Sequence, residues 1–474
     1  MTFKKTKIVA TLGPAIDSKE KIKELSVAGV NVFRINFSHA NYDNVTRVVK
    51  DIREMNAKYG YNVAVLADLQ GPKLRIGEME DGVVLEEGAT FIFTNDACIG
   101  SSEKAYMNYV PFAKDVKVGE TILVDDGKLS FEVLETNSIN EVKTKVLVGG
   151  ALTSKKGVNL PNTNISQPSL TEKDIKDAIF AIGLEVDWFA LSFVRNVSDI
   201  KKLKKLIKKH SDCKIPVIAK IEKPEAILNI SEIVRKSDGI MVARGDLGVE
   251  LPMERVPLLQ KMLVEKAKEA RIPVIIATQM MESMITNPTP TRAEVNDVAN
   301  SIMDGADAVM LSGETSIGKY PVKVIDQMRR IIESVEDSSR IQVSHKAPYI
   351  LSKRYMTKAI CYHAALMADD VEAKVIQTLT NSGYTAFQVS AWRPNSNILA
   401  YTSNKRIVSR LSLLWGVKAF YYNKKKSTDD TVTDLEIIAK KEGYVSKNDL
   451  VITLSSMPVE ESGMVNTLRI TTIK

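Results

Sequence analysis

Residues 216–246 read PVIAKIEKPEAILNISEIVRKSDGIMVARGD, and this stretch decides the fold. A largely apolar run, Pro216–Ile221, gives way to a polar turn and an amphipathic stretch before a second apolar run begins at Gly239–Ala243. Two parallel strands need a long crossover between them, and that crossover is usually a helix. The stretch therefore predicts a strand, a helix and a second strand of an α/β fold.

The same unit recurs along the chain. Eight short β-branched runs each precede an amphipathic stretch. They are Lys7–Thr11, Val32–Asn36, Val63–Asp68, Asp187–Ser192, Pro216–Ile221, Gly239–Ala243, Pro273–Thr278 and Ala308–Leu311. Eight parallel strands with helices between them favour a closed (β/α)8 TIM barrel over an open doubly wound sheet. We expect the barrel to occupy residues 1–69 and 170–340.

The third and fourth runs are too far apart for one helix to connect them, because roughly a hundred residues lie there. Turn residues at 125–127 (Asp-Asp-Gly) and 149–150 (Gly-Gly) separate segments of strand composition. These segments are Thr90–Thr94, Thr121–Val124, Leu129–Glu135 and Lys143–Val148. The pattern predicts a small β-barrel domain, residues 70–169, inserted into a barrel loop.

Two further features complete the predicted architecture. The delayed helix of the third unit is expected at Thr171–Ile182, opened by a capping box of Ser169 with Glu172. After a helix around Val322–Val335 and a polar linker, Glu336–Lys346, a third domain of α/β type is expected over 345–474. Its elements are predicted at Lys358–Asp369, Lys374–Leu379, Thr385–Trp392, Leu450–Leu454 and Thr467–Ile473.

Composition and charge are those of a folded globular protein, with 44% hydrophobic and 26% charged residues. The net charge is +7, but Asp and Glu balance Lys and Arg along most of the chain, which argues against nucleic acid as a partner. A mildly basic protein suits small anionic substrates. Cys98, Cys213 and Cys361 lie far apart, which argues against a disulfide framework or a zinc site. Without a signal-peptide run or a stretch of about 18 apolar residues, we expect a cytoplasmic protein with no membrane span.

The reactive groups of a (β/α)8 barrel lie at the carboxyl ends of its strands and in the loops that follow. On the fifth run, Lys220 and Glu222 are two residues apart and point to the same side. A lysine on an otherwise apolar strand needs a reason to be buried. The sixth run is followed by Asp246 with a glycine two residues later and one immediately before it, which permits close approach of a ligand.

Glu222 and Asp246 make a sparse oxygen site suited to Mg²⁺ or Mn²⁺, which keeps waters and shares substrate oxygens. A pair of catalytic acids, as in glycoside hydrolases, is one alternative. A structural Lys–Glu pair inside the barrel is another. The neighbouring lysine and arginines favour the metal site and anion chemistry.

Polar residues also follow the other runs. Arg34, Asn36 and Ser38 share one face if their strand stays extended, and such a row is costly unless it binds something. Thr278, after the seventh run, either relays a proton or caps the following helix. The helix starts at Gly245 and Ser312 offer free backbone N–H groups to a carboxylate or phosphate.

These segments resemble the pyruvate kinases, in the family's order and over the whole barrel. The resemblance rests on KIVATLGP (7–14), FRINFSH (33–39), DLQGPKLR (68–75), VIAKIE (217–222), MVARGDLGVE (241–250), ATQMMESM (277–284), TRAEVNDVAN (291–300) and DGADAVMLSGET (304–315). It implies a magnesium-dependent enzyme that transfers the phosphoryl group of phosphoenolpyruvate to ADP, giving pyruvate and ATP in the last step of glycolysis.

The resemblance also implies residue roles. Lys220 would neutralise the transferring phosphoryl group and the developing enolate, Arg34 would hold the phosphate, and Thr278 would lie near the carbon that is protonated. Glu222 and Asp246 would bind the divalent metal. The substrate is expected to contact Arg34, Lys220, Arg244, Gly245, Asp246, Thr278 and Ser312, and the nucleotide Pro14, Asn36, His39, Arg75 and Lys173.

A monovalent cation, if one binds, would use Asn36, Ser38, Asp68 and the carbonyl group of Leu69. Potassium-requiring members of the family usually have a glutamate where this chain has Lys73. An ammonium group there supplies a charge that the cation would otherwise provide, so we expect K⁺ not to be required. The inserted domain would act as a lid that excludes water.

In the third domain, residues 378–385 join a strand to a helix and resemble the family's loop for phosphorylated allosteric effectors. The expected contacts are Thr378, Thr380, Asn381, Ser382, Gly383 and Thr385. An ordinary capped helix start is the alternative. The family also implies a homotetramer.

Two rival functions are a carbon–carbon lyase acting on pyruvate-like substrates and a catalytically silent scaffold. A lyase needs neither nucleotide residues nor a lid, and a silent protein is expected to lose Lys220 or a metal ligand.

Overall fold

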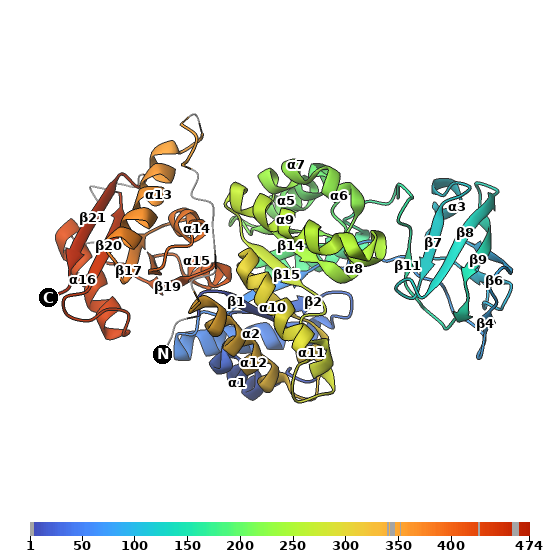
Figure 1. The fold of residues 1–474 in the computed structure, drawn as a ribbon, viewed down its shortest axis with the longest axis horizontal. Coiled ribbons are helices and arrows are strands. Elements are labelled where there is room, and N and C mark those ends of the chain that lie inside the picture. Colours follow the sequence, from blue (N-terminus) through green and yellow to red (C-terminus); the bar gives the residue numbers. More distant parts are fainter. Residues whose placement is uncertain (1–3, 339–340, 342–346, 351, 425–426, 457–463) are drawn as a thin grey trace.

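Three bodies lie in a row: a central barrel, an inserted β-domain at one end and a C-terminal α/β domain at the other (Figure 1). The computed structural model describes residues 4–338, 341, 347–350, 352–424, 427–456 and 464–474. The predicted linker at 336–346 lies mostly outside these residues. The exact domain boundaries therefore stay predictions.

The central body is a closed barrel of eight parallel strands, which confirms the expected (β/α)8 fold. In order around the barrel, the strands are β1 (Lys7–Thr11), β16 (Ala308–Leu311), β15 (Val274–Ala277), β14 (Gly239–Ala243), β13 (Val217–Ile221), β12 (Trp188–Leu191), β3 (Ala64–Asp68) and β2 (Val32–Asn36). All are buried on both faces except at the end of β2, as expected of a parallel sheet covered by helices.

Helices surround the barrel and bury their apolar faces against the outer side of its strands. The longer ones are α1 (Lys19–Ala28), α2 (Tyr42–Tyr59), α4 (Glu172–Gly183), α5 (Val197–His210), α7 (Ile230–Lys236), α9 (Val256–Ala270), α10 (Arg292–Asp304) and α12 (Pro321–Glu336). Short helices precede four of them: α6 (Pro224–Leu228), α8 (Arg244–Glu250), η2 (Glu282–Ile285) and α11 (Gly313–Ser316), with η1 (Met253–Arg255) between α8 and α9.

The capping box predicted for α4 was placed two residues too early. Thr171 is the N-cap, and its hydroxyl accepts the Asp174 N–H while the Asp174 carboxylate accepts the Thr171 N–H. Ser169 instead donates its hydroxyl to the carbonyl group of Phe193. Asp can take the place of Glu in this reciprocal arrangement, and the sequence pattern with Glu172 misled the prediction.

The inserted domain contains a six-stranded sheet and a two-stranded sheet. The larger runs β11 (Val158–Asn159), β7 (Thr121–Val124), β8 (Leu129–Thr136), β9 (Glu141–Val148), β5 (Thr90–Thr94) and β6 (Lys104–Tyr106), and the smaller pairs β10 (Gly150–Ala151) with β4 (Val84–Leu85). Packed phenylalanines, including Phe91, Phe93 and Phe131, form a core separate from that of the barrel. This body also contains the short helix α3 (Phe112–Asp115).

The C-terminal domain is a five-stranded sheet with helices, as expected. Its strand order is β19 (Val417–Tyr421), β18 (Asn397–Thr402), β17 (Val375–Leu379), β20 (Leu450–Ser455) and β21 (Thr467–Thr472), and the β20–β21 pair is antiparallel. Its helices are α13 (Tyr355–Asp370), α14 (Tyr384–Ala391), α15 (Lys405–Arg410), η3 (Leu411–Leu413) and α16 (Thr428–Lys441).

The C-terminal domain closes the amino end of the barrel. Leu413 is fully buried among the residues that fill the barrel interior, such as Trp188 and Met310. The Trp188 indole donates to the carbonyl oxygen of Arg410 at 3.1 Å, and its ring packs against Phe387. The barrel core therefore includes a side chain from another domain.

Three aspartates at the amino end tie neighbouring strands together. Asp187, Asp238 and Asp307 each precede a strand and accept the N–H of a residue in the preceding strand of the barrel. Each also pairs with a cation: Arg53 for Asp187, Lys204 and Lys214 for Asp238, and Arg393 for Asp307. The device fixes strand order at this end.

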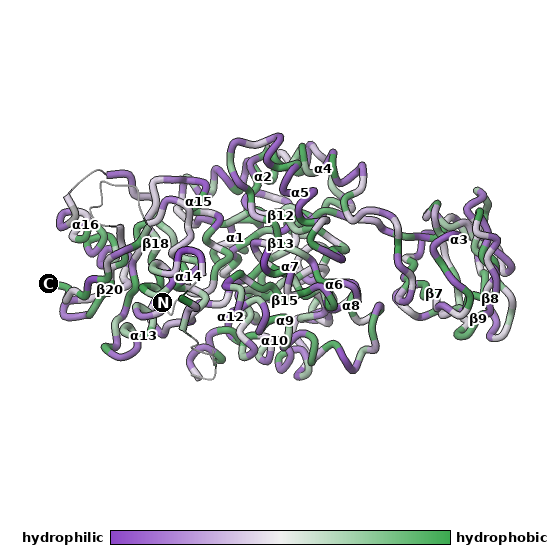
Figure 2. The backbone as a smooth tube through the Cα atoms, turned by 90° about the horizontal axis from the view of Figure 1, so that it is seen from above, coloured by the Kyte–Doolittle hydropathy of each residue, from purple (hydrophilic) through white to green (hydrophobic). Residues whose placement is uncertain are grey.

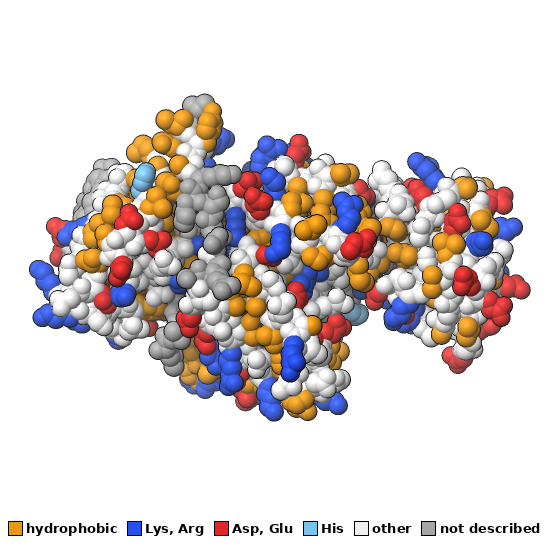
Figure 3. All heavy atoms as spheres, in the orientation of Figure 1, with side chains coloured by type: hydrophobic (Ala, Val, Ile, Leu, Met, Phe, Trp, Pro, Cys, Tyr) orange, Lys and Arg blue, Asp and Glu red, His pale blue; other side chains and the backbone are white. Residues whose placement is uncertain are grey.

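Positive and negative side chains are interspersed over the face shown in Figure 3, with no wide region of one sign. In the part of the chain that the structure describes, no helix combines the length and apolar character needed to cross a membrane.

Candidate active site

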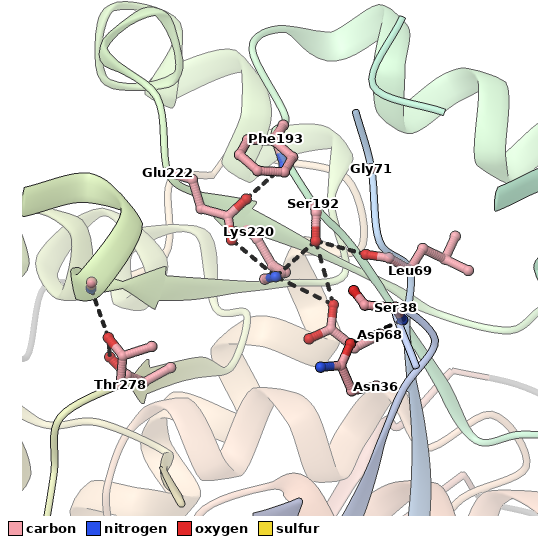
Figure 4. A network of polar contacts seen from close by, with 12 residues as sticks. Asn36, Ser38, Asp68, Leu69, Gly71, Ser192, Phe193, Lys220, Glu222 and Thr278 are labelled. Carbon is pink, nitrogen blue, oxygen red and sulfur yellow. Dashed lines mark hydrogen bonds and ion pairs between the residues drawn. The ribbon is translucent and has the colours of Figure 1, made fainter. Parts of the chain in front are cut away.

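Asp68, Ser192, Lys220 and Glu222 meet at the carboxyl ends of β3, β12 and β13 (Figure 4). Lys220 lies two residues beyond Ile218 and shares its inward face, as the strand period requires. Its ammonium group donates to the Ser192 hydroxyl at 2.7 Å and lies 2.9 Å from Glu222 Oε1 and 3.4 Å from Asp68 Oδ1. The Lys220–Glu222 part of the predicted cluster is thus a direct contact, and Asp246, its third predicted member, acts on both through its charge.

Lys220 is held as a cation. Burial alone would lower the pKa of its ammonium group, but the carboxylates of Asp68 and Glu222 outweigh burial and raise that pKa above its ordinary value. Asp68 responds in the opposite sense. Burial favours its neutral form, yet Lys220 and Arg34 hold the pKa of Asp68 below its ordinary value. The ion pair is therefore fully charged at neutral pH.

Glu222 is less well compensated. Burial raises the pKa of its carboxyl group to about 6; Lys220 acts to lower it, and the nearby carboxylate of Asp246 raises it again. Glu222 Oε2 also accepts the Phe193 N–H at 2.7 Å. Two acids that repel each other at adjacent strand ends leave a negative potential that a cation would relieve.

The donor set fits a hard divalent ion. Glu222 follows β13, and Asp246 lies in the first turn of α8 after the neighbouring strand β14. Among the described residues, no three His, Cys, Asp or Glu side chains are grouped closely enough to hold a metal by themselves. Mg²⁺ commonly takes one or two carboxylates and completes its shell with water and substrate oxygens. Two acids, of which Asp246 lines the cleft between the barrel and the inserted domain, match that preference.

Arg34 joins the cluster from β2. Its Nε donates to Asp68 Oδ2 at 2.6 Å and its Nη1 to the Thr11 hydroxyl at 3.0 Å. The strand ends at Asn36, so the expected extended face does not continue to Ser38. Ser38 lies in a turn and donates its N–H to Asn36 Oδ1 at 3.1 Å.

The four positions predicted for a monovalent cation lie close together in Figure 4. The register pairs Asn36 with Asp68 on adjacent strands. Several of their oxygens already have partners in the protein: Asp68 pairs with Arg34 and Lys220, and the carbonyl oxygen of Leu69 accepts the Ser192 hydroxyl at 2.7 Å. Positive charge from the protein therefore already occupies this region.

Thr278 has a strained backbone. Its φ is 71°, which is rare for a β-branched residue and typical of functional sites. The hydroxyl accepts the Gly245 N–H at 2.7 Å and donates to the carbonyl oxygen of Ala277 at 2.5 Å. The next helix, η2, begins after Met281, so the alternative that Thr278 caps the following helix is wrong. Thr278 joins its own strand end to α8.

The other predicted substrate residues line the same rim. The Arg244 guanidinium donates to Asp297 Oδ1 at 2.6 Å and to the carbonyl oxygen of Thr278 at 2.8 Å, not to Glu222 or Asp246. Only its backbone remains near Gly245 and Asp246. Ser312 donates its N–H to Glu314 Oε2 at 2.7 Å. These bonds fix the loops after β14, β15 and β16.

The residues predicted for the nucleotide are more dispersed. Lys173 donates to Asp177 at 2.6 Å and to the carbonyl oxygen of Phe37 at 2.7 Å. Arg75 donates to the carbonyl oxygen of Lys155 in the inserted domain at 2.5 Å. Pro14 and His39 are exposed. With Asn36 they stay predictions.

The predicted effector loop follows β17, in the domain that closes the opposite end of the barrel. Thr380 accepts the Gly383 N–H at 3.0 Å, while Asn381 and Ser382 are exposed and Thr378 and Thr385 are buried. Helix α14 starts after Gly383, whose φ is 80°, and no side chain caps it. The effector role of this loop and the alternative of an ordinary helix start both stay predictions.

Sequence reasoning missed Ser192, Phe193, Lys223 and Glu250. Ser192 could have been found, since it is the polar last residue of the fourth apolar run. Phe193 orients Glu222 through its backbone and packs tightly on Gly71, where an added Cβ would lie 2.7 Å from the ring. Lys223 and Glu250 form a buried ion pair at 2.6 Å, and no sequence spacing connects them.

Comparisons with known proteins agree with this geometry. A family model described as the pyruvate kinase barrel domain matches residues 3–325, and one described as the pyruvate kinase alpha/beta domain matches residues 358–471. The crystal structure of a pyruvate kinase from Cryptosporidium parvum matches with a TM-score of 0.92 at 33% identity, covering 99% of this chain and 96% of its own.

Relatives in bacteria are similar over nearly the whole chain. The pyruvate kinase of Geobacillus stearothermophilus is 42% identical across 98% of this chain and 80% of its own length. That of Corynebacterium glutamicum is 41% identical across 98% of this chain and 97% of its own length. Because the family models and the relatives together span the barrel and the C-terminal domain, the chain is an enzyme of the pyruvate kinase family.

Proposed function

We propose that this phosphotransferase moves the phosphoryl group of phosphoenolpyruvate to ADP, giving pyruvate and ATP, and that it needs Mg²⁺ or Mn²⁺. The observation that carries the proposal is the buried Lys220 cation, held between Asp68 and Glu222 near a third acid, Asp246. Phosphoryl transfer depends mainly on positioning and on cations placed where negative charge develops.

Each residue has a defined task in this reaction. Lys220 neutralises charge on the transferring group and on the enolate oxygen, and Arg34 orients the phosphate. The divalent ion, held by Glu222 and Asp246, would supply further charge neutralisation when bound. The substrate carboxylate would bind at the backbone of residues 244–246, where it must share or replace the bond between the Gly245 N–H and Thr278.

Forming pyruvate requires a proton on the terminal enolate carbon. The Thr278 hydroxyl is fixed by its bond to Gly245 and donates to a carbonyl oxygen rather than to a carboxylate. It can therefore orient a water that delivers the proton without itself becoming ionised. Strain in its backbone supports such a placement, because the fold maintains it at a cost.

We further propose that K⁺ is not required. Lys73 lines the cleft between the barrel and the inserted domain, together with Asp126 and Asp246. Burial lowers the pKa of the Lys73 ammonium group. The positive charge of Arg75 lowers it as well, and the carboxylate of Asp246 acts to raise it. An ammonium group beside Asp246 can supply the positive charge for which a cation at Asn36, Ser38, Asp68 and Leu69 would otherwise be needed.

The remaining proposals rest on the family. We propose that the protein acts in the cytoplasm in the last step of glycolysis, that the inserted domain closes over the nucleotide, and that the chain forms a homotetramer. The loop at 378–385 is proposed to bind a phosphorylated effector, since Asn381 and Ser382 present free polar side chains to solvent at a helix start.

The test is ATP formation from phosphoenolpyruvate and ADP with Mg²⁺, with K⁺ replaced by tetramethylammonium at equal ionic strength. We expect turnover that changes less than about twofold on adding K⁺ and disappears without Mg²⁺. The Lys73→Glu variant should become K⁺-activated. Turnover that requires K⁺ in the unaltered protein would refute the Lys73 argument alone, whereas pyruvate release without ADP would favour a lyase.

A further inference from the structure

Two connectors join the inserted domain to the barrel, and Figure 2 shows them running side by side. The return connector, residues 157–170, begins with β11, which pairs with β7 of the inserted domain. A bridge between Arg75 and Gly157 links the two connectors. The position of the inserted domain therefore depends on what holds residues 157–170.

Asn159 in this connector bonds to the barrel helix that carries a proposed metal ligand. Its Nδ2 donates to Glu250 Oε1 at 2.9 Å, and Lys223 Nζ donates to the same oxygen at 2.6 Å. Glu250 is 3% exposed and Lys223 is 5% exposed. Buried hydrogen bonds to a charged group are among the stronger ones.

Glu250 has unused bonding capacity. Its other oxygen, Oε2, is buried and has no hydrogen-bond partner among the described residues. A buried carboxylate satisfied at one oxygen only depends strongly on the bonds it does make. Losing the Asn159 donor would leave Lys223 as the sole remaining partner shown for that oxygen.

A second attachment lies further along the same connector. Arg195, between β12 and α5, donates Nη2 to the carbonyl oxygen of Gln167 at 2.6 Å and Nη1 to that of Ile165. Ser169, near the end of this connector, donates its hydroxyl to the carbonyl oxygen of Phe193 at 2.8 Å, so the return connector is bonded to the barrel rim at three places. Because these bonds hold the connector to the rim along its length, the connector can act as a fixed pivot while the inserted domain turns.

We propose that Glu250 is a positioning residue that fixes this pivot through Asn159 and so aligns the inserted domain with Asp246. Helix α8 has Asp246 in its first turn and Glu250 in its last, so it connects the pivot rigidly to the acid site. The effect on catalysis rests on the proposed function, because the inserted domain is there taken to cover the nucleotide. The effect on the position of the domain does not.

Native thiols allow the position to be measured directly. Cys98 lies in the inserted domain and Cys213 in the barrel, and both are partly exposed. Cys361 is buried, and burial raises the pKa of its thiol to about 12, so it will not react readily. Spin labels on Cys98 and Cys213 therefore report the distance between the two bodies by pulsed electron paramagnetic resonance.

The informative variant is Asn159→Asp, which keeps the side-chain shape but sets a carboxylate against Glu250. We expect the distance distribution to broaden clearly and the KM for ADP to rise about tenfold, with a smaller change for phosphoenolpyruvate. Asn162→Asp, an exposed site on the same connector, is the matched control and should behave like the unaltered protein. Asn159→Ala should show a smaller broadening, because it removes a bond without adding repulsion.

The exchange variant Asn159→Asp with Glu250→Gln tests the contact itself. It restores an amide–carboxylate pair and keeps a carboxylate beside Lys223. The distribution of distances between the two spin labels should therefore become nearly as narrow as in the unaltered protein. Equal distributions for Asn159→Asp and Asn162→Asp would overturn the proposal, as would an exchange variant no closer to the unaltered protein than Asn159→Asp alone. If the unaltered enzyme forms no ATP, the proposed function fails while the distances still decide the pivot.

Discussion

The two ends of the barrel both bury charged groups, but they arrange them differently. At the amino end, Asp187, Asp238 and Asp307 each accept a backbone N–H and pair with a fixed cation. At the carboxyl end, burial raises the pKa of Glu222, and the negative charge of Asp246 raises it as well. Each of the three acids at the amino end has a cation at ion-pair distance, whereas at the carboxyl end a second carboxylate, that of Asp246, opposes the ionised form of Glu222.

This difference separates stability from function on one scaffold. Acids that pair with cations of the protein stabilise strand order, and the Arg393–Asp307 pair holds the C-terminal domain in place. Charges that repel each other cost stability and are kept only where a substrate or metal relieves the repulsion. Variants at the amino end should therefore change unfolding, and variants at the carboxyl end should change catalysis.

The largest effect is expected for Lys220→Met. Removing the cation leaves the developing charge uncompensated, and kcat should fall at least about 10³-fold. Lys7→Met is the matched control, since Lys7 is also a buried lysine on a barrel strand, with its ammonium group bonded to the carbonyl oxygen of Val417 at the amino end. Its kcat should stay within about threefold of the unaltered value. Equal losses in the two variants, measured by steady-state kinetics, would break the comparison.

Arg393→Met should mainly affect stability. Arg393 and Asp307 form a buried pair at 2.9 Å, and breaking such a pair costs about 3–5 kcal/mol because one charge is left alone. Urea unfolding should show this loss while kcat hardly changes. Arg406→Met, which breaks an exposed pair with Glu185 between the same two domains, should cost less than about 1 kcal/mol. A kcat loss in Arg393→Met as large as that of Lys220→Met would contradict the assignment of stability to the amino end and catalysis to the carboxyl end.

Glu222→Gln should weaken divalent metal binding at least about tenfold, as followed by the resonance of free Mn²⁺. In the unaltered protein, binding should also weaken as pH falls through about 6, because the carboxyl group of Glu222 then takes up a proton. Its raised pKa means that the folded protein binds more protons than the unfolded chain between the ordinary value of 4.5 and about 6, so this group's contribution to stability falls as pH rises through that window. Asp307→Asn should leave Mn²⁺ affinity unchanged.

The smallest effect concerns Lys268 at the amino end. Burial and the charge of Arg393 together lower the pKa of its ammonium group to about 8, although Asp307 and Asp304 act to raise it. Between about 8 and the ordinary value of 10.5 the unfolded chain holds a proton that the folded protein has released, so stability rises with pH across that window. Lys268→Met should flatten this rise in urea midpoints measured at several pH values. Parallel curves for the two proteins would show that the lysine is solvated.

The sequence was sufficient to predict the barrel because its strands are buried on both faces and therefore appear as apolar runs. Each of the eight predicted runs contains a barrel strand, with ends that differ by at most one residue at either side. Short elements were missed because two or three residues have no periodicity, as in β10 and β11. Strands β18 and β19 and helices α15 and α16 were also not predicted.

The sequence predicted which residues lie at the strand ends of the candidate site, but not most of the hydrogen bonds and ion pairs between them. Asp68 ends β3, while Lys220 and Glu222 lie at the end of β13, and β12 separates these two strands; the inward direction of Lys220 follows from strand period, but its reach across β12 to Asp68 does not. The Asn159–Glu250 bond and the positive φ of Thr278 depend on how loops fold back, and no local pattern encodes them. Leu413 shows the same limit, because an apolar residue does not reveal which core it enters.

The burial of Leu413 in the barrel has a consequence for how the protein is made. The last barrel strand, β16, leaves the ribosome well before residue 413 does, and at roughly 5–20 residues per second the interval lasts several seconds. During that time the apolar mouth formed by residues such as Trp188 and Met310 is open to water and to other chains. Nascent chains should therefore be most prone to aggregate, and most in need of a chaperone, between completion of the barrel and arrival of the C-terminal domain.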